Sequence, residues 1–185
     1  MDIFTAFGLS FSAGLNAYIP LLVLSILAKF TDLITLKSPW DTLTNGWVIG
    51  VLVFLSLVEF FADKIPAVNH INDAVQTVVR PAAGAIVFAA TSSVADIHPV
   101  LAMVAGLLVA GGVHATKSAA VRPAVTATTG GAGNVPVSIF EDMVSTVLSI
   151  FSIIIPIIIA IVIAIFILLV VWWLWRRANR KVLEY

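Results

Sequence analysis

Two acidic residues, Glu59 and Asp63, lie four positions apart at the end of an otherwise apolar run. Residues at that spacing share one face of a helix, and Ser56 falls on the same side. Two carboxylates on one face can bind a cation or relay protons. The alternative is that both acids are solvated at the membrane interface or paired with Lys64.

A second cluster follows in two similar segments. Its members fall on one helical face within each segment: Asp73, Gln76 and Arg80 in the first, and Glu141, Asp142 and Ser145 in the second. An ionisable residue within a membrane domain is a candidate functional residue. The alternative is a pair of amphipathic helices that lie on the membrane surface with their polar faces in water.

Basic residues gather near one helical side at His114, Lys117 and Arg122. With Arg80 they could hold an anion, and the histidine could carry a coupled proton. They could instead mark a helix end that contacts phospholipid head groups. The set of His114, Glu59 and Asp63 lacks metal-ligand spacing, so we expect no metal site and no cofactor.

Two stretches interrupt the apolar pattern with helix-breaking residues. The segment 14–20 contains Asn16 and ends in Pro20, which predicts a break inside a membrane span. The segment 126–136 is uncharged but rich in Gly, Pro and Thr. It predicts a re-entrant loop, in which Thr128, Thr129 and the following glycines could cradle an anion with backbone N–H groups. An ordinary exterior loop is the alternative.

Composition explains why these few charged residues are notable. Hydrophobic residues make up 61% of the 185 residues and charged residues 11%, whereas a typical soluble domain is about one quarter charged. Lipid must therefore cover part of the surface. The uncharged runs are 3–28, 42–58, 81–95, 97–116, 123–140 and 143–175. About 20 apolar residues cross a bilayer as a helix.

Charge balance and motifs exclude several classes of function. Ten acidic and ten basic residues cancel, which argues against a nucleic-acid partner. The chain has no cysteine, so it can form neither disulfides nor thiolate metal sites. It contains no P-loop, nucleophile elbow or zinc-protease motif. We therefore expect a protein that is not an enzyme.

The C-terminal region indicates an orientation. Tryptophans at 172, 173 and 175 form an interfacial belt, and basic residues follow at 176, 177, 180 and 181. The positive-inside rule then predicts a cytoplasmic C-terminus. Pro156 is expected to divide the long run 143–175 into an amphipathic helix and a final span. Arg80-Pro81 is expected to end the amphipathic helix 68–79.

A shift of 69 positions superimposes the two polar segments. Asp73 and Thr77 then meet Asp142 and Thr146 as identities, and the apolar positions of 68–78 fall on those of 137–147. A proline-bearing turn precedes both segments, at Pro66 and at 134–136. We interpret this as an internal duplication, with one repeat at about 3–92 and the other at about 98–176. Repeats of opposite topology with broken helices are common in secondary transporters.

The same stretches carry a family resemblance. They are the pieces at 12–18 (SAGLNAY), 58–66 (VEFFADKIP), 80–85 (RPAAGA) and 128–131 (TTGG), with His114, Lys117, Arg122, Glu141 and Asp142. At these residues the chain resembles a bacterial membrane family catalogued as domain of unknown function 4126. The resemblance runs from about Leu9 to Ser152. It implies a place in the bacterial inner membrane and leaves the substrate open.

Together these features predict one integral membrane domain over 1–185. We expect an all-α polytopic membrane protein of about 5–7 helices, several of them broken, with an inverted repeat and re-entrant segments. The expected function is a small secondary transporter or channel-like permease for a small solute or ion, surrounded by membrane lipids and associated as a homo-oligomer. The alternative is a lipid-interacting or membrane-organising protein without transport activity.

Overall fold

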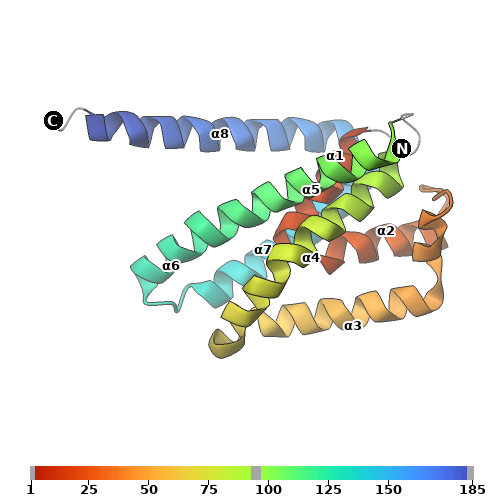
Figure 1. The fold of residues 1–185 in the computed structure, drawn as a ribbon, viewed down its shortest axis with the longest axis horizontal. Coiled ribbons are helices and arrows are strands. Elements are labelled where there is room, and N and C mark those ends of the chain that lie inside the picture. Colours follow the sequence, from red (N-terminus) through yellow and green to blue (C-terminus); the bar gives the residue numbers. More distant parts are fainter. Residues whose placement is uncertain (1–2, 93–96, 183–185) are drawn as a thin grey trace.

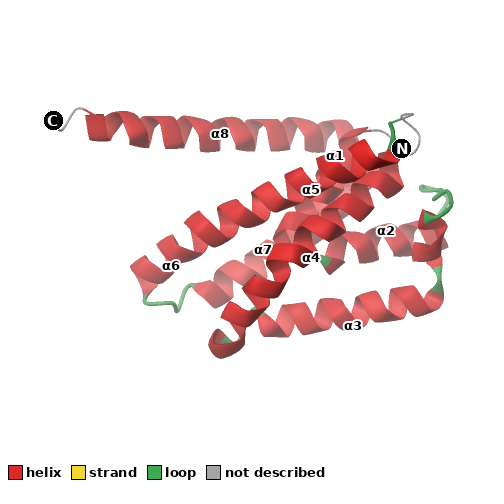
Figure 2. Ribbon diagram, in the orientation of Figure 1, coloured by secondary structure: helices red, strands yellow, loops and turns green. Residues whose placement is uncertain are grey.

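The computed structural model describes residues 3–92 and 97–182, except for the side chains of 66–70, 156–160, 173–174 and 177–182. These residues form helices joined by short connections, and none of them is in a β-strand (Figures 1 and 2). In chain order the elements are α1 (Ile3–Leu15), α2 (Tyr18–Phe30), the 3-10 helix η1 (Trp40–Thr44), α3 (Gly46–Ala62), α4 (Pro66–Ser92), α5 (Pro99–Thr116), the π-helical turn η2 (Lys117–Val121), α6 (Arg122–Thr129), α7 (Asn134–Ile154) and α8 (Pro156–Val182).

Helix α1 lies at the centre of the bundle, where it packs against α4, α5 and α7. Its contacts fix the directions of its neighbours. Ser10 bonds to Gly84 while Phe7 meets Phe88 edge to face, so α1 and α4 are antiparallel. Ser12 bonds to Ser149 and Asn16 to Asp142, so α1 and α7 are antiparallel as well.

Helices α4 and α7 therefore run in the same direction, as Figure 1 also shows. A two-fold axis in the membrane plane would make corresponding helices antiparallel. The predicted inverted relation does not hold for this pair. Their shared direction is the one that an axis along the membrane normal would give.

Small residues allow the central helices to approach closely. A methyl group added at Gly84 would collide with Ala110 and with the backbone of Gly106, and one added at Gly14 would collide with Val113. Such contacts are typical of helix pairs in membranes, where close packing replaces the hydrophobic driving force.

Polarity on the two amphipathic helices is reversed relative to a soluble protein. On α4, Val78 is 71% exposed while Arg80 is fully buried. On α7, Phe140 is 65% exposed while Glu141 and Asp142 are buried. The two amphipathic segments thus turn their polar faces inward and their apolar faces outward, which excludes helices lying on a membrane surface with polar faces in water. Lipid is the solvent that suits such an exterior.

Three helical segments are long and apolar enough to cross a bilayer: Ile71–Ser92, Pro99–Thr129 and Asn134–Ile154. Shorter apolar helices accompany them, among them α3 and the described part of α8. The protein is thus an all-α polytopic membrane protein.

The two prolines at predicted helix ends have different effects. Pro156 separates α7 from α8 as expected. Pro81 does not end a helix, because α4 continues through it to Ser92. Neighbouring helices support a proline inside a membrane helix, and here α1 and α5 pack along α4.

The expectation of a re-entrant loop at 126–136 was wrong. Helix α6 extends to Thr129, and an exposed turn with positive φ at Gly130 and Gly131 leads into α7 at one end of the molecule (Figure 2). The hydroxyl groups of Thr128 and Thr129 donate to the carbonyl oxygen of Val125 in their own helix rather than to groups inside the bundle.

Helix α8 lies along one side and contacts only part of the bundle (Figure 1). Phe166 meets Phe11 of α1 edge to face at 5.9 Å. Trp172 and Trp175 are exposed, and the guanidinium carbon of Arg176 lies 5.2 Å from the centre of the Trp172 ring. The other members of the predicted C-terminal belt, Trp173, Arg177, Arg180 and Lys181, have side chains outside the described residues.

Candidate functional site

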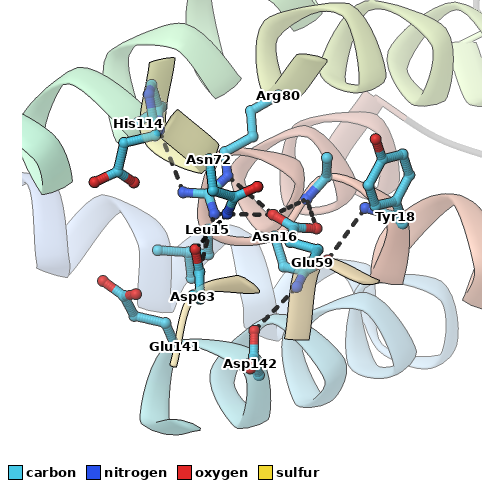
Figure 3. A network of polar contacts seen from close by, with 12 residues as sticks. Leu15, Asn16, Tyr18, Glu59, Asp63, Asn72, Arg80, His114, Glu141 and Asp142 are labelled. Atoms are coloured by element: carbon cyan, nitrogen blue, oxygen red, sulfur yellow. Dashed lines mark hydrogen bonds and ion pairs between the residues drawn. The ribbon is translucent and has the colours of Figure 1, made fainter. Parts of the chain in front are cut away.

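A fully buried arginine, Arg80, lies at the centre of a polar cluster near the middle of α4 (Figure 3). Its Nε and Nη2 donate to Oε1 of Glu59 at 3.2 and 2.9 Å. Its Nη1 lies 3.2 Å from Nδ1 of His114. Because arginine has only donors, this Nδ1 accepts, and Nε2 of the same ring lies 3.2 Å from Oγ1 of Thr77.

The break between α1 and α2 is built into this cluster. Oδ1 of Asn16 accepts from the backbone N–H groups of Tyr18 and Ile19, both at 3.1 Å, and so caps α2. Glu59 accepts from the N–H of Ala17 at 3.1 Å. A carboxylate thus faces the N-terminus of α2, where the helix dipole is positive.

The other side of the break meets a positive charge. Helix α1 ends at Leu15, whose carbonyl oxygen lies 3.3 Å from Nζ of Lys117. A cation near a helix C-terminus is stabilised by the negative end of the dipole. Both half-helix ends at Asn16 are therefore compensated by charges from other helices, Glu59 on α3 and Lys117 on η2.

Helix α7 contributes two adjacent acids that point to different partners. Asp142 accepts from Nδ2 of Asn16 at 2.9 Å and pairs with Lys64 at 3.0 Å. Glu141 pairs with Lys117 at 2.7 Å and lies 3.9 Å from Arg122. Adjacent helical positions differ by about 100°, which is why one acid reaches α1 and the other reaches η2 and α6.

A wider, π-helical turn of the chain precedes Arg122 and begins at Lys117, and both side chains enter the bundle. Residues 117–121 form a π-helical turn between α5 and α6, and single π-turns inside helices often occur at functional sites. Both basic residues are buried. Arg122 pairs with Asp73 at 3.1 Å, which connects α6 to the first turns of α4.

Asp63, the residue that follows α3, joins the remaining groups. Nη2 of Arg80 and Nη2 of Arg122 lie 3.5 and 3.4 Å from its Oδ2, and Nζ of Lys117 lies at 3.9 Å. Asn72 donates to Oδ1 at 2.6 Å. We call eight connected ionisable residues and the neighbouring Lys64–Asp142 pair the charge network: Glu59, Asp63, Asp73, Arg80, His114, Lys117, Arg122 and Glu141, with Lys64 and Asp142.

Burial makes this network energetically demanding. Removing each ion from water costs on the order of several kcal/mol of desolvation free energy. The attraction between paired charges offsets this desolvation cost only when the geometry of the pair is good. Glu59 and Arg80 are both essentially inaccessible. Every member of the network has an oppositely charged or hydrogen-bonding partner among the described residues.

A serine cluster extends the polar interior beside the charges. Oγ of Ser12 on α1 lies 2.7 Å from Oγ of both Ser145 and Ser149 on α7. Ser145 also donates to the backbone oxygen of Ser12 at 3.2 Å. Interhelical hydrogen bonds of this kind contribute about 0.6 kcal/mol each in membrane proteins. They hold α1 against α7 next to Asn16.

The structure brings together ten of the residues singled out from the sequence. They are Asn16, Glu59, Asp63, Asp73, Arg80, His114, Lys117, Arg122, Glu141 and Asp142. Thr128 and Thr129 do not join them, because both are exposed and bond to the backbone of α6.

Three contributors were missing from the sequence-based site. Lys64 pairs with Asp142, and Asn72 donates to Asp63. Ser138 donates to Asp63 at 3.4 Å. Asn72 and Ser138 belong to the polar stripes of the two similar segments, so the stripes carried the signal. Lys64 had been considered only as a partner of Glu59 and Asp63.

The described residues include no set of side chains arranged as metal ligands. Within residues 3–92 and 97–182, no group of three or more His, Cys, Asp or Glu side chains is placed to hold a metal ion. Basic side chains separate the acids of the charge network. The arrangement places acids and bases in alternation, so that Asp63 and Glu141 each lie within reach of more than one basic side chain.

One family model matches the chain, over residues 3–177, and it is described as a domain of unknown function (DUF4126). No curated protein and no solved structure matches the chain. The match agrees with the resemblance seen at the polar and broken stretches, several of which now converge in the charge network. Because it covers nearly the whole sequence, the protein belongs to the DUF4126 family.

Proposed function

We propose that this protein is a small secondary transporter or channel-like permease of the bacterial inner membrane, and that it moves a small solute or ion through the charge network. The observation that carries the proposal is the fully buried Arg80–Glu59 pair in a helix bundle whose outer surface is apolar. A lone charge at the bilayer centre costs from about 3 to over 10 kcal/mol, depending on method. A purely structural role would need only neutral packing.

The broken helix supports the same proposal. Transporter sites are often formed by discontinuous helices whose ends face the substrate or coupling ion. Here α1 and α2 meet at Asn16, and Lys117 and Glu59 face the two helix ends. In this proposal α1 and α2 form a re-entrant pair that enters and leaves through one membrane face, and α3, α4, α5 with α6, α7 and α8 cross the membrane.

Orientation, repeat and assembly complete the proposal. The basic C-terminal end of α8 is cytoplasmic, in line with the positive-inside rule. The segments around Asp73 and Asp142 derive from a duplication and supply the two acidic sides of the pathway. Homo-oligomers form through the apolar outer faces, because a scaffold of 185 residues is narrow for a transporter.

The direction of the polar faces favours transport over the alternative of a lipid-interacting or membrane-organising protein. Binding of lipid head groups requires basic side chains that reach the surface. Arg80, Lys117 and Arg122 are instead buried among acids. Membrane lipids are then the solvent of the outer surface rather than the ligand.

Reconstitution tests the proposal. Purified protein in liposomes is exposed to concentration steps of protons, sodium, potassium, chloride, formate and acetate, and flux is compared with empty liposomes. The double variant Asp73→Asn, Asp142→Asn should fold, insert and lose flux. The matched control, Thr128→Ala, removes an exposed hydroxyl outside the network and should retain it.

Two results would count against transport. Folded wild-type protein that moves none of these ions would remove the support for a permease of small ions. Full flux in the double variant would exclude these two acids as parts of the pathway. Loss of folding in the double variant, with no flux in the wild type, would assign the network a structural role.

A further inference from the structure

The carboxylate of Asp63 sits where an anion ligand would sit. Three basic side chains surround its Oδ2, from Arg80, Lys117 and Arg122 at 3.5, 3.9 and 3.4 Å. All three residues are buried and come from α4, η2 and α6. Such a convergence of cations on one oxygen is how proteins bind carboxylates and phosphates.

Neutral donors complete the shell. Nδ2 of Asn72 donates to Oδ1 at 2.6 Å, and Oγ of Ser138 donates to Oδ2 at 3.4 Å. One oxygen thus has an amide donor, while the other has a hydroxyl and three cations. This asymmetric shell fits a planar group with two oxygens and a single negative charge. It therefore favours a carboxylate over a larger divalent anion.

The cations do not depend on Asp63 for their positions. Arg80 is held by Glu59 at 2.9 Å, Lys117 by Glu141 at 2.7 Å and Arg122 by Asp73 at 3.1 Å. Contacts between charged groups of this kind are typically 2.7–2.9 Å long. The longer distances to Asp63 show that the shell is anchored elsewhere and that the carboxylate occupies space that other residues define.

Asp63 also lies outside the regular helices. It directly follows α3, at the start of a connection of three residues, 63–65, that leads to α4. Replacing one carboxylate by another leaves the charge of the surrounding shell unchanged. An incoming anion therefore needs no additional counter-ion.

We infer that this shell is an anion-binding site which Asp63 fills in the absence of ligand, and that its ligand is a small monocarboxylate that takes the place of the Asp63 side chain. The inference rests on the proposed function and names the solute class of that same site. Formate and acetate are the simplest members of the class.

Removal of the internal carboxylate tests the site directly. The variant Asp63→Ala leaves a vacancy of carboxylate size among the three cations. In detergent solution buffered with a bulky sulfonate, formate and acetate should raise its unfolding temperature in a saturable way, while the neutral analogues formamide and acetamide should not. Asp41→Ala, which removes an exposed acid of η1, should show no such response.

Competition with Asp63 predicts a second result. The wild-type protein should bind the same anions at least tenfold more weakly than Asp63→Ala, because its site is free only in the fraction of molecules that have withdrawn Asp63. Adding Arg122→Gln to Asp63→Ala should weaken formate binding again. A response that is equal for formate and formamide, or that survives unchanged with Arg122→Gln, would overturn the anion site.

If Asp63→Ala does not fold, the wild-type protein still tests the anion site. In that case the wild-type protein alone must show saturable stabilisation by formate or acetate, and its absence overturns the site. Flux separates this inference from the proposed function. Formate binding without flux would contradict the transport function and support the anion site. Flux of sodium or protons without any carboxylate binding would support transport and contradict the anion site.

Discussion

Nζ of Lys117 lies 3.3 Å from the carbonyl oxygen of Leu15, so a buried ammonium group caps the end of α1 inside the bundle. The same nitrogen lies 2.7 Å from Glu141 on α7. One side chain from η2 thus holds both the broken helix and one acid of the network. This dual role gives the first prediction.

Replacing Lys117 by Gln should destabilise the protein by about 3–5 kcal/mol, because Glu141 would be left as a buried charge without its closest partner. Unfolding in mixed micelles with increasing denaturing detergent measures the change. The exposed Lys29 provides the matched control, and Lys29→Gln should be neutral. The double variant Lys117→Gln, Glu141→Gln should cost less than the sum of the single variants; strict additivity would contradict the pairing.

Arg80→Lys should behave as a disruptive change despite the conserved charge. Arg80 donates from Nε and Nη2 to Glu59 and from Nη1 to His114. A lysine ammonium cannot reproduce this planar fork. We expect a loss of stability of about 2 kcal/mol or more, by the same unfolding measurement, since a buried charged group then lacks some of its hydrogen bonds. An unchanged midpoint would show that the fork has no energetic role.

The contact between α4 and α5 predicts a contrast between two glycines of α5. In Gly106→Ala the new methyl group would collide with the backbone of Gly84 and with Phe88, and we expect destabilisation of about 1–3 kcal/mol. Gly112 has open space around it, so Gly112→Ala should be neutral or slightly stabilising because alanine is the better helix former. Equal effects of the two substitutions would contradict the close approach.

The arrangement of helices predicts a transmembrane topology that cysteine labelling can read. The chain has no native cysteine, so single substitutions need no background removal. Asp41→Cys and Ala132→Cys are exposed and separated by α3, α4 and the continuous α5–α6 unit. An impermeant maleimide should label them from opposite sides of the membrane. The C-terminus should lie on the same side as Ala132, so a reporter fused after Tyr185 should show cytoplasmic activity. Periplasmic activity would reject the proposed orientation.

Much of the polar interior could be predicted because its stripes follow the helical period. Asp73, Gln76 and Arg80 share a face, and the matching face of 138–149 is buried in the same polar interior. The break at Asn16 was also visible, since a polar residue followed by Pro20 interrupts an apolar run.

Other features depend on contacts that one segment cannot encode. Lys117 meets Leu15 across 102 positions, and Asn16 meets Asp142 across 126. Helix direction was equally hidden, so the similar segments suggested an inverted pair although α4 and α7 run the same way. The glycines after Thr129 form an exposed turn instead of the predicted re-entrant loop. Composition alone does not separate a re-entrant segment from a connection at the membrane surface.

The meeting of Gly84 and Gly106 also determines which parts can move. With backbones in direct contact, α4 and α5 have no room to slide or rotate past each other. They therefore act as one rigid body that carries Arg80 and His114. Helix α3 and the residue after it reach α4 through side-chain pairs, from Glu59 to Arg80 and from Asp63 to Asn72. Tilting α3 away would separate ion pairs while leaving that glycine contact intact, so the proposed transport would move α3 against a fixed α4–α5 pair.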